Sequence, residues 1–211
     1  MWTGIPQKKT IANALTDLKL ALQQRKFVIA ETIAERILIK VPHHPNAFYL
    51  LGMSAFMQSN LDQAIIYFQK AFSYGLDNPV AHVNYANIVG QKGQYHLSLN
   101  HLNKAVTLQQ DYQQAWLMGY QLALKVGDTE LGVFYSQGLV NNFPENDLHW
   151  SYAGNAYHMN IDDDKAIQTL IKGMEKFPES PELQMTLAGI FELQHKLLEA
   201  EQLVLDILKV N

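Results

Sequence analysis

One helix-like pattern recurs along this chain at a fixed interval of 34 residues or a multiple of it. It reads LDQAIIYFQKAF from Leu61, YHLSLNHLNKAV from Tyr95 and DDKAIQTLIKGM from Asp163. Steps of 34 place six repeat starts, at Ile11, Pro45, Pro79, Gln113, Asp147 and Pro181. A unit this short cannot bury its apolar face alone, whereas stacked copies bury a continuous core. The period therefore predicts an array of small units rather than a single globule.

Residue size recurs at set positions within the repeat, counted from these starts. The twentieth position is small in all six copies: Ala30, Ala64, Ser98, Gly132, Ala166 and Ala200. The eighth position is mostly small, as in Gly52 and Gly154, whereas the fourth and twenty-fourth are bulky in most copies, as in Phe48 and Phe68. Small residues let two helix backbones approach while larger ones fill the space beside them. This pattern predicts two antiparallel helices in close contact in each repeat.

The expected helix boundaries carry matching chemistry. Asn78 precedes Pro79 and Ser180 precedes Pro181, which places a capping side chain before a proline at the first helical position. Gly93 and Gly127 fall in the expected turn between the two helices of their repeats. No strand-like alternation appears, so we predict an all-α chain.

The stretch FYLLGMSAFMQSNLDQAIIYFQKAF resembles the tetratricopeptide repeat. Its motif residues fall on Phe48, Leu51, Gly52, Ala64, Phe68 and Ala71, and in the fifth repeat on Trp150, Gly154, Tyr157, Ala166 and Pro178. The resemblance covers residues 11–211 and implies a right-handed α-solenoid of about six helix-turn-helix repeats. We expect residues 1–10 to form an N-terminal leader and residues 11–211 a single domain. Asp17-Leu18 and Gly119-Tyr120 depart from the Leu-Gly of the motif, which predicts altered helix packing there.

Composition excludes several classes of protein. The net charge of -4 argues against a nucleic-acid partner. The chain has no cysteine, so disulfides, thiolate metal sites and cysteine nucleophiles are excluded. The N-terminus lacks the apolar run of a secretory signal, and no segment approaches the roughly 20 apolar residues of a membrane span. We therefore expect a soluble, cytoplasmic protein.

No motif points to catalysis, a cofactor or a metal. His43-His44 lie in an expected turn without a third ligand nearby, and His96 and His101 are five residues apart instead of the four that would align two imidazoles. The run Asp162–Asp164 lacks the alternating ligands of a calcium loop and is better explained by helix capping. No glycine-rich phosphate loop or G-x-S-x-G motif occurs. We predict that the protein is not an enzyme.

The tetratricopeptide resemblance implies a concave groove lined mainly by first helices. In the first repeat it would include Leu15, Lys19 and Leu22. The main peptide-groove candidates are Tyr49, Met53, Phe56, Asn84, Asn87, Leu117, Gln121, Tyr152, Asn155 and Met159. The Lys, Asn and Arg set that clamps a terminal carboxylate in some members is absent. The ninth position instead carries Asn87, Gln121 and Asn155, a row of amides that suits either pairing with a peptide backbone or simple solvation of the groove.

We therefore expect a non-catalytic scaffold that binds a partner protein or peptide. Two alternatives are the substrate-recruiting arm of a larger bacterial-type glycosyl- or sulfotransferase, and an assembly factor for an envelope or pilus system. Without a covering helix after it, the second helix expected in the last repeat would expose apolar residues such as Leu197, Val204 and Leu208. That predicts self-association through the C-terminal repeat or a chain that continues in a longer protein.

Overall fold

The computed structural model of the chain describes residues 10–194, and the described residues form eleven α-helices and no strand. They divide into two compact units, and the boundary between the units follows residue 101, inside the helix Tyr95–Leu108. The first helices of the repeats are α1 (Ile11–Gln23), α3 (Pro45–Met57), α5 (Pro79–Gln91), α7 (Gln113–Val126), α9 (Asp147–Met159) and α11 (Pro181–Leu193). The second helices are α2 (Phe27–Lys40), α4 (Leu61–Ser73), α6 (Tyr95–Leu108), α8 (Thr129–Asn142) and α10 (Asp163–Lys176). The all-α solenoid of helix-turn-helix repeats is confirmed.

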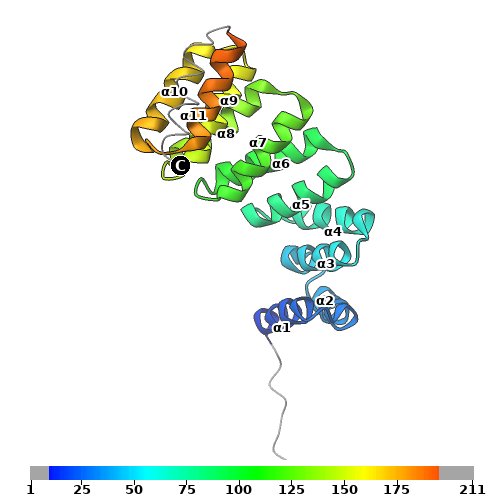
Figure 1. Ribbon diagram of the computed structural model, residues 1–211. Helices are drawn as coiled ribbons and strands as arrows, with labels where there is room; N and C mark the ends of the chain where they lie inside the picture. Colours follow the sequence, from blue (N-terminus) through cyan, green and yellow to red (C-terminus); the bar gives the residue numbers. More distant parts are fainter. Residues whose placement is uncertain (1–9, 195–211) are drawn as a thin grey trace, which may run out of the picture. The chain divides into compact units, whose positions relative to one another are not determined.

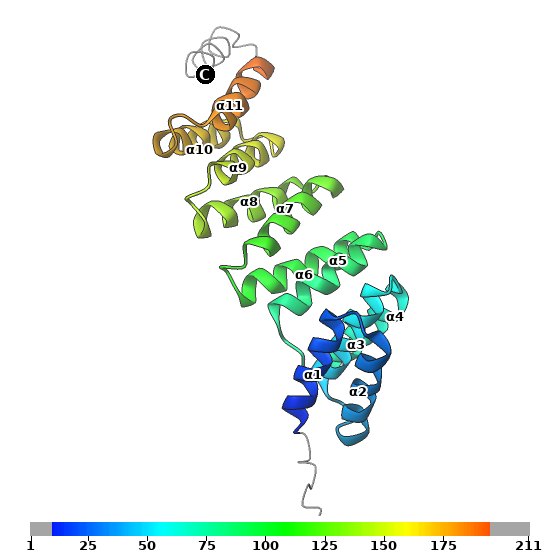
Figure 2. The same cartoon turned by 60° about the horizontal axis from the view of Figure 1, so that its bottom comes forward.

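All six first helices begin at a residue that the 34-residue steps mark as a repeat start. Paired helices run antiparallel and lie side by side within each unit (Figures 1 and 2). Whether the repeats together form one domain preceded by a leader stays a prediction. The second helix expected for the sixth repeat, with Leu197, Val204 and Leu208, falls on residues outside the described part of the chain.

The turn inside each hairpin has the same backbone conformation. Arg25, Ser59, Gly93, Gly127 and Ile161, spaced by 34 residues, all adopt a positive φ between 55° and 77°. This left-handed conformation reverses the chain within three residues or fewer and suits glycine best. The predicted turn glycines, Gly93 and Gly127, are confirmed, and three other residue types adopt the same conformation without glycine's freedom.

Capping side chains set the helix starts as predicted. Asn78 accepts a hydrogen bond from the backbone N–H of Ala81, and Ser180 accepts one from that of Leu183. Asp162 caps α10 by accepting from the backbone N–H of Lys165, which confirms that the acidic run belongs to a helix start. The carboxylate of Asp162 also receives a hydrogen bond from Lys165 Nζ at 2.6 Å, and this contact lowers the pKa of Asp162.

In the first unit, small residues of one helix receive large residues of its partner. A Cβ added to Gly52 would lie 2.6 Å from Cδ2 of Phe68, which is fully buried. Ala30 and Ala64, at the twentieth position, are also buried. The second hairpin then stacks on the first, because Phe48, Leu51 and Ala71 join Leu18, Leu22 and Ile37 in one core cluster.

The second unit follows the same rule with one variation. In the fifth repeat, a Cβ on Gly154 would lie 2.5 Å from Cγ of Leu170, which matches the arrangement of Gly52 and Phe68. In the fourth repeat, a Cβ on Gly119 would overlap the ring of Tyr135. Both members of this pair stand one residue earlier in the repeat than Gly52 and Phe68 do. The departure at Gly119-Tyr120 therefore shifts the packing register of the hairpin and keeps its close contact.

Candidate functional site

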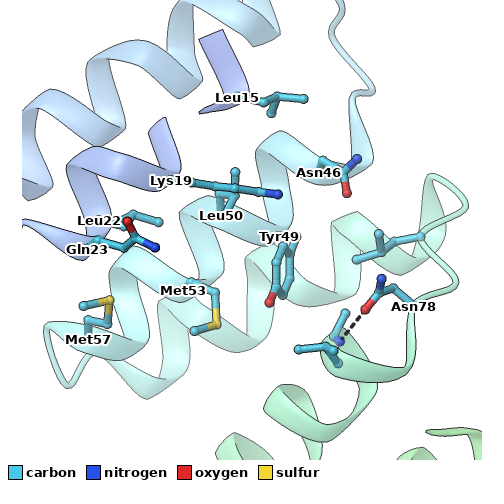
Figure 3. Close-up of a pocket in the computed structure, with 13 residues that line it drawn as sticks. Leu15, Lys19, Leu22, Gln23, Asn46, Tyr49, Leu50, Met53, Met57 and Asn78 are labelled. Atoms are coloured by element: carbon cyan, nitrogen blue, oxygen red, sulfur yellow. Dashed lines mark hydrogen bonds between the residues drawn. The ribbon is translucent and has the colours of Figure 1, made fainter. Parts of the chain in front are cut away.

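The first unit contains a pocket of about 610 Å³ on the side of its first helices. Side chains from α1 and α3 line most of it, and the start of α5 closes one end (Figure 3). Its apolar lining comes from Leu15, Leu22, Tyr49, Leu50, Met53, Met57, Leu76, Val80 and Ala81. Lys19, Gln23, Asn46 and Asn78 contribute the polar side chains. The pocket thus combines an apolar floor with a few polar groups, which is the usual composition of a binding site.

In both α1 and α3, the residues that line the pocket lie on one side of the helix. Residues three and four apart lie on one side of a helix, as do Leu15, Lys19 and Leu22 on α1 and Tyr49, Met53 and Met57 on α3. The opposite side of α3 carries the buried core residues Leu51 and Ala55, whereas on α1 the buried Leu18 lies next to Leu22. Because other sides of these helices pack in the core, this side is left to line the pocket.

Among the predicted groove residues of this unit, Tyr49 contacts both of the helices that follow α3. Its hydroxyl accepts a hydrogen bond from Asn84 Nδ2 on α5 at 2.9 Å, and its ring meets that of Phe68 edge-on. Asn84 is thereby brought to the pocket although it does not line it. Phe56 and Asn87 do not line this pocket either. Asn87 is exposed on α5, where its Oδ1 accepts from Gln91 Nε2 at 3.3 Å.

The second unit has its own pocket, of about 480 Å³, lined by α7, α9 and α11. Two of the predicted residues, Tyr152 and Asn155, contribute to it. The ring of Tyr152 stacks on that of Tyr120 with centroids 5.0 Å apart. Ser151 and Thr186 bridge α9 and α11 through hydroxyls 2.8 Å apart. This lining is more polar than that of the first unit.

Electrostatics also distinguish the second pocket. Burial raises the pKa of Tyr120, and a hydrogen bond from the side chain of Asn155 partly opposes that rise. His158 lines the pocket, and its Nδ1 lies 2.6 Å from Oδ1 of Asp163 on α10. Glu182 adds a carboxylate to the lining, in contrast to Lys19 in the first pocket.

The other predicted residues of this unit lie nearby without lining the pocket. Leu117 is partly exposed, whereas Gln121 and Met159 are exposed. All ten groove candidates are therefore at least partly accessible, and none is sealed in the core. Their role in binding remains a prediction.

A histidine pair that the sequence did not reveal lies in the first unit. His82 Nδ1 and His101 Nδ1 are 2.8 Å apart, and Phe72 stacks on the His82 ring at 4.7 Å with nearly parallel planes. Asp77 Oδ1 lies 3.4 Å from the other ring nitrogen of His82. The two histidines lie on different helices, α5 and α6, so helical spacing along the sequence could not indicate that they are close in space. His82 is buried, and we interpret the pair as a polar cross-link inside the hairpin.

Within residues 10–194, no three histidine, aspartate or glutamate side chains gather closely enough to hold a metal ion. None of the described helices is long and apolar enough to cross a membrane.

Comparisons with known proteins agree with this architecture. The tetratricopeptide repeat family matches residues 18–75. This range includes the Leu51-Gly52 motif and the turns that join the two helices in the first and second hairpins. Tetratricopeptide repeat proteins also occur among the structurally similar proteins. The resemblance seen in the sequence is confirmed: residues 18–75 match the tetratricopeptide repeat family, and the helical hairpins of the described residues have the fold of tetratricopeptide repeat proteins. No curated protein sequence matches the chain.

Three solved structures illustrate the similarity of fold. The structure of Naa15/Naa10 bound to HypK-THB has a TM-score of 0.77 and 16% identity over 92% of this chain, which spans only 30% of that longer chain. YrrB, described as a TPR protein with an unusual peptide-binding site, has a TM-score of 0.63 and 18% identity over 84% of this chain and 91% of its own. The C-terminal part of a TPR repeat-containing protein from Cytophaga hutchinsonii has a TM-score of 0.68 and 16% identity over 93% and 78% of the two chains. At these identities the likeness concerns the fold alone.

Proposed function

We propose that the protein is a non-catalytic scaffold that binds an extended segment of a partner protein along its first helices. Proteins of this repeat class generally serve protein–protein interaction. One observation carries the more specific proposal: in both units, the first helices line an open pocket that contains predicted groove residues. A cytoplasmic location belongs to the same proposal and can be checked by cell fractionation.

In the first unit, the pocket suits apolar side chains of the partner. Met53 and Met57 are flexible and polarisable, so they can adapt to side chains of different shape. Tyr49 offers a rigid ring that the bond from Asn84 holds in place. Lys19 is exposed at the edge of the pocket, where it would attract an acidic residue next to the apolar ones.

The amides at the ninth position suit the partner's backbone. Asn87, Gln121 and Asn155 are exposed, and each amide combines a donor with an acceptor. A peptide backbone offers the same two groups at every residue, so amides can bind it with little regard to side chains. Asn87 and Asn155 each use part of this capacity within the chain, on Gln91 and Tyr120 respectively.

The test begins with peptides selected from a displayed random library on the full chain. Their dissociation constants are then measured by isothermal titration calorimetry. The double variant Asn87→Ala/Asn155→Ala should weaken binding by about 1–3 kcal/mol, because it removes polar contacts to the partner's backbone. Tyr120→Phe is the matched control, since it removes the internal partner of Asn155 and leaves the amide in place.

Apolar recognition in the first unit needs a separate variant. Met53→Glu places a charge in the apolar pocket and should abolish selection of peptides with large aliphatic or aromatic residues. Selection of no peptide by the intact chain would contradict the scaffold proposal. Unchanged affinity of the asparagine variant would instead remove only the backbone-pairing role.

A second candidate is that the chain is the substrate-recruiting arm of a larger glycosyl- or sulfotransferase, or an assembly factor for an envelope or pilus system. Arrays of this fold also occur within longer chains, as in the structure of Naa15/Naa10 bound to HypK-THB, of which this chain spans 30%. Native mass determination of the protein from its own cells distinguishes this candidate from a free scaffold.

A further inference from the structure

Two positions that bring aromatic rings together in the second repeat carry histidines in the third. The fourth and twenty-third residues of the second repeat are Phe48 and Tyr67, whose ring centroids are 6.4 Å apart. In the third repeat the same positions hold His82 and His101, with centroids 5.0 Å apart. Histidine is the side chain that ordinarily takes up a proton near neutral pH. The third repeat therefore adds a titratable pair that this ring packing does not require.

The distance between two nitrogen atoms limits the number of protons that the pair can hold. His82 Nδ1 and His101 Nδ1 are 2.8 Å apart, which is the length of a hydrogen bond and requires one proton between them. With no proton there, two lone pairs would face each other, and with two protons the hydrogen atoms would overlap. The closed pair is therefore either neutral or carries a single positive charge.

The neighbouring groups indicate where the protons lie. Asp77 Oδ1 is 3.4 Å from Nε2 of His82, and a carboxylate favours a proton on the nitrogen that faces it. The neutral His82 ring therefore carries its proton on Nε2 and accepts with Nδ1, so His101 donates from its own Nδ1. Phe72 stacks on the His82 ring with planes 4° apart and holds this orientation. One further proton can then bind to Nε2 of His101.

Three elements of the first unit face the pair. The loop between α4 and α5 presents Asp77, whose side chain is 69% exposed, so water weakens its attraction for a charged ring. From α5, Tyr85 meets the His101 ring edge-on with centroids 4.6 Å apart. Burial raises the pKa of Tyr85, so its hydroxyl stays uncharged at neutral and acidic pH. From α4, Phe72 contacts both histidine rings and has no titratable group.

The pair also lies beside the end of the first pocket that α5 closes. His82 follows Ala81, and Ala81 lines that pocket together with Asn78 at the cap of α5. Two residues beyond His82, Asn84 donates a hydrogen bond to Tyr49 at 2.9 Å. Loosening of the start of α5 would therefore loosen this wall of the pocket.

We propose that the pair is an acid-sensitive lock, which opens the start of α5 when both histidines become charged. In an open hairpin each ring takes up its own proton at the usual pH of about 6.5. The open state then binds two protons where the closed state binds one, so it gains about tenfold for each pH unit below about 6. Above about pH 7 this difference vanishes and the lock stays closed.

The first test replaces one histidine by a side chain that keeps the bond but removes the limit on protons. In His101→Asn, the amide can turn either its N–H or its oxygen toward Nδ1 of His82, so that ring can take up a proton and stay bonded. Amide hydrogen exchange of α5 is measured in the intact full chain and in the variant at pH 7 and pH 5. Comparison at equal pH removes the intrinsic effect of pH on exchange. We expect the opening constant of α5 to rise at least ~10-fold more in the intact chain than in the variant.

His96→Asn is the matched control. His96 is an exposed histidine on α6, five residues before His101, and its loss should leave the exchange of α5 as it is in the intact chain. His82→Asn repeats the test from the other ring, because its amide can bond with Nδ1 of His101 in the same way. This second variant keeps the test decisive if asparagine at residue 101 alone opens the hairpin at pH 7.

The second test observes the protons directly, through the chemical shifts of the ring nitrogens in an isotope-labelled chain. At pH 7 the shifts should place a proton on Nδ1 of His101 and on Nε2 of His82. On acidification the folded chain should show at most one charged ring in the pair.

Three results would overturn the proposal. They are an equal response of the intact chain and both asparagine variants of the pair to pH, a His96→Asn chain that loses the response, and two charged rings in the folded chain at pH 5. None of these measurements uses a bound peptide, so their outcome is independent of the proposed function.

Discussion

The second and fourth repeats, one in each unit, build the same helical hairpin from pairs that differ by one residue in register. In the second repeat, Gly52 receives Phe68, whereas in the fourth Gly119 receives Tyr135. Because both partners move by one position, the helices stay in contact and the small residue still faces the large one. Both repeats therefore keep a glycine packed against an aromatic ring, although the two residues occupy different positions in the repeat.

The shift also changes the surface beside the hairpin. Tyr120, at the position of Gly52, is 4% exposed and stacks on Tyr152 of the next first helix. It also bonds with Asn155, as Tyr49 does with Asn84 in the first unit. Both units thus link successive first helices by a tyrosine–asparagine bond, but the tyrosine is half-buried at Tyr49 and fully buried at Tyr120.

The largest effect is expected from adding one methyl group where the shifted pair meets. Gly119→Ala places a Cβ on the ring of Tyr135, which is fully buried and cannot move aside. We expect a loss of about 3 kcal/mol in the free energy of unfolding, at the upper end of the range for overpacking. Gly52→Ala should also destabilise the chain. Denaturant unfolding followed by circular dichroism measures both.

Gly189→Ala is the matched control for these glycines. Gly189 is also helical, but a Cβ there would meet nothing within 4 Å. The variant should gain up to about 1 kcal/mol from the higher helix propensity of alanine. A Gly119→Ala chain as stable as Gly189→Ala would show that the fourth repeat is not packed in the shifted register.

The sequence was sufficient to predict the repeat architecture but not this shift. Period and residue size located the helix starts and the turns at Gly93 and Gly127, because these depend on local chemistry within each repeat. The contact of Gly119 with Tyr135, like that of His82 with His101, joins two different helices. A slide of one residue in both helices leaves composition and period unchanged, so the departure at Gly119-Tyr120 indicated where the packing changes but not that the change is a shift in register. For the candidate site, the sequence indicated which helix faces are open, whereas the bond between Asn155 and Tyr120 required coordinates.

The hairpin turns offer a second, smaller comparison between the units. Gly93 in the first unit and Ile161 in the second occupy the same left-handed turn position, with φ of 77° and 60°. Ile161 is β-branched and 93% exposed, so it pays the steric cost of this conformation without gaining burial. Ile161→Gly should therefore stabilise the chain by about 1 kcal/mol, and Gly93→Ile should destabilise it by a similar amount. Equal stability of Ile161→Gly and the intact chain would mean that the turn relaxes around isoleucine.

The smallest effect concerns the pH dependence of the second unit. Burial raises the folded-state pKa of Tyr120 above its usual value of 10.0. A raised pKa contributes stability that is present below pH 10.0 and is lost as the pH rises through the folded-state value. Tyr120→Phe should thus make the free energy of unfolding fall less steeply above that pH.

Asn155→Ala should raise the pKa of Tyr120 further, because the hydrogen bond from Asn155 lowers it. The difference in tyrosinate absorbance between chains with and without Tyr120 isolates this titration. A pKa that is unchanged by Asn155→Ala would show that the two side chains do not bond in solution, and the parallel with Tyr49 and Asn84 would then fail.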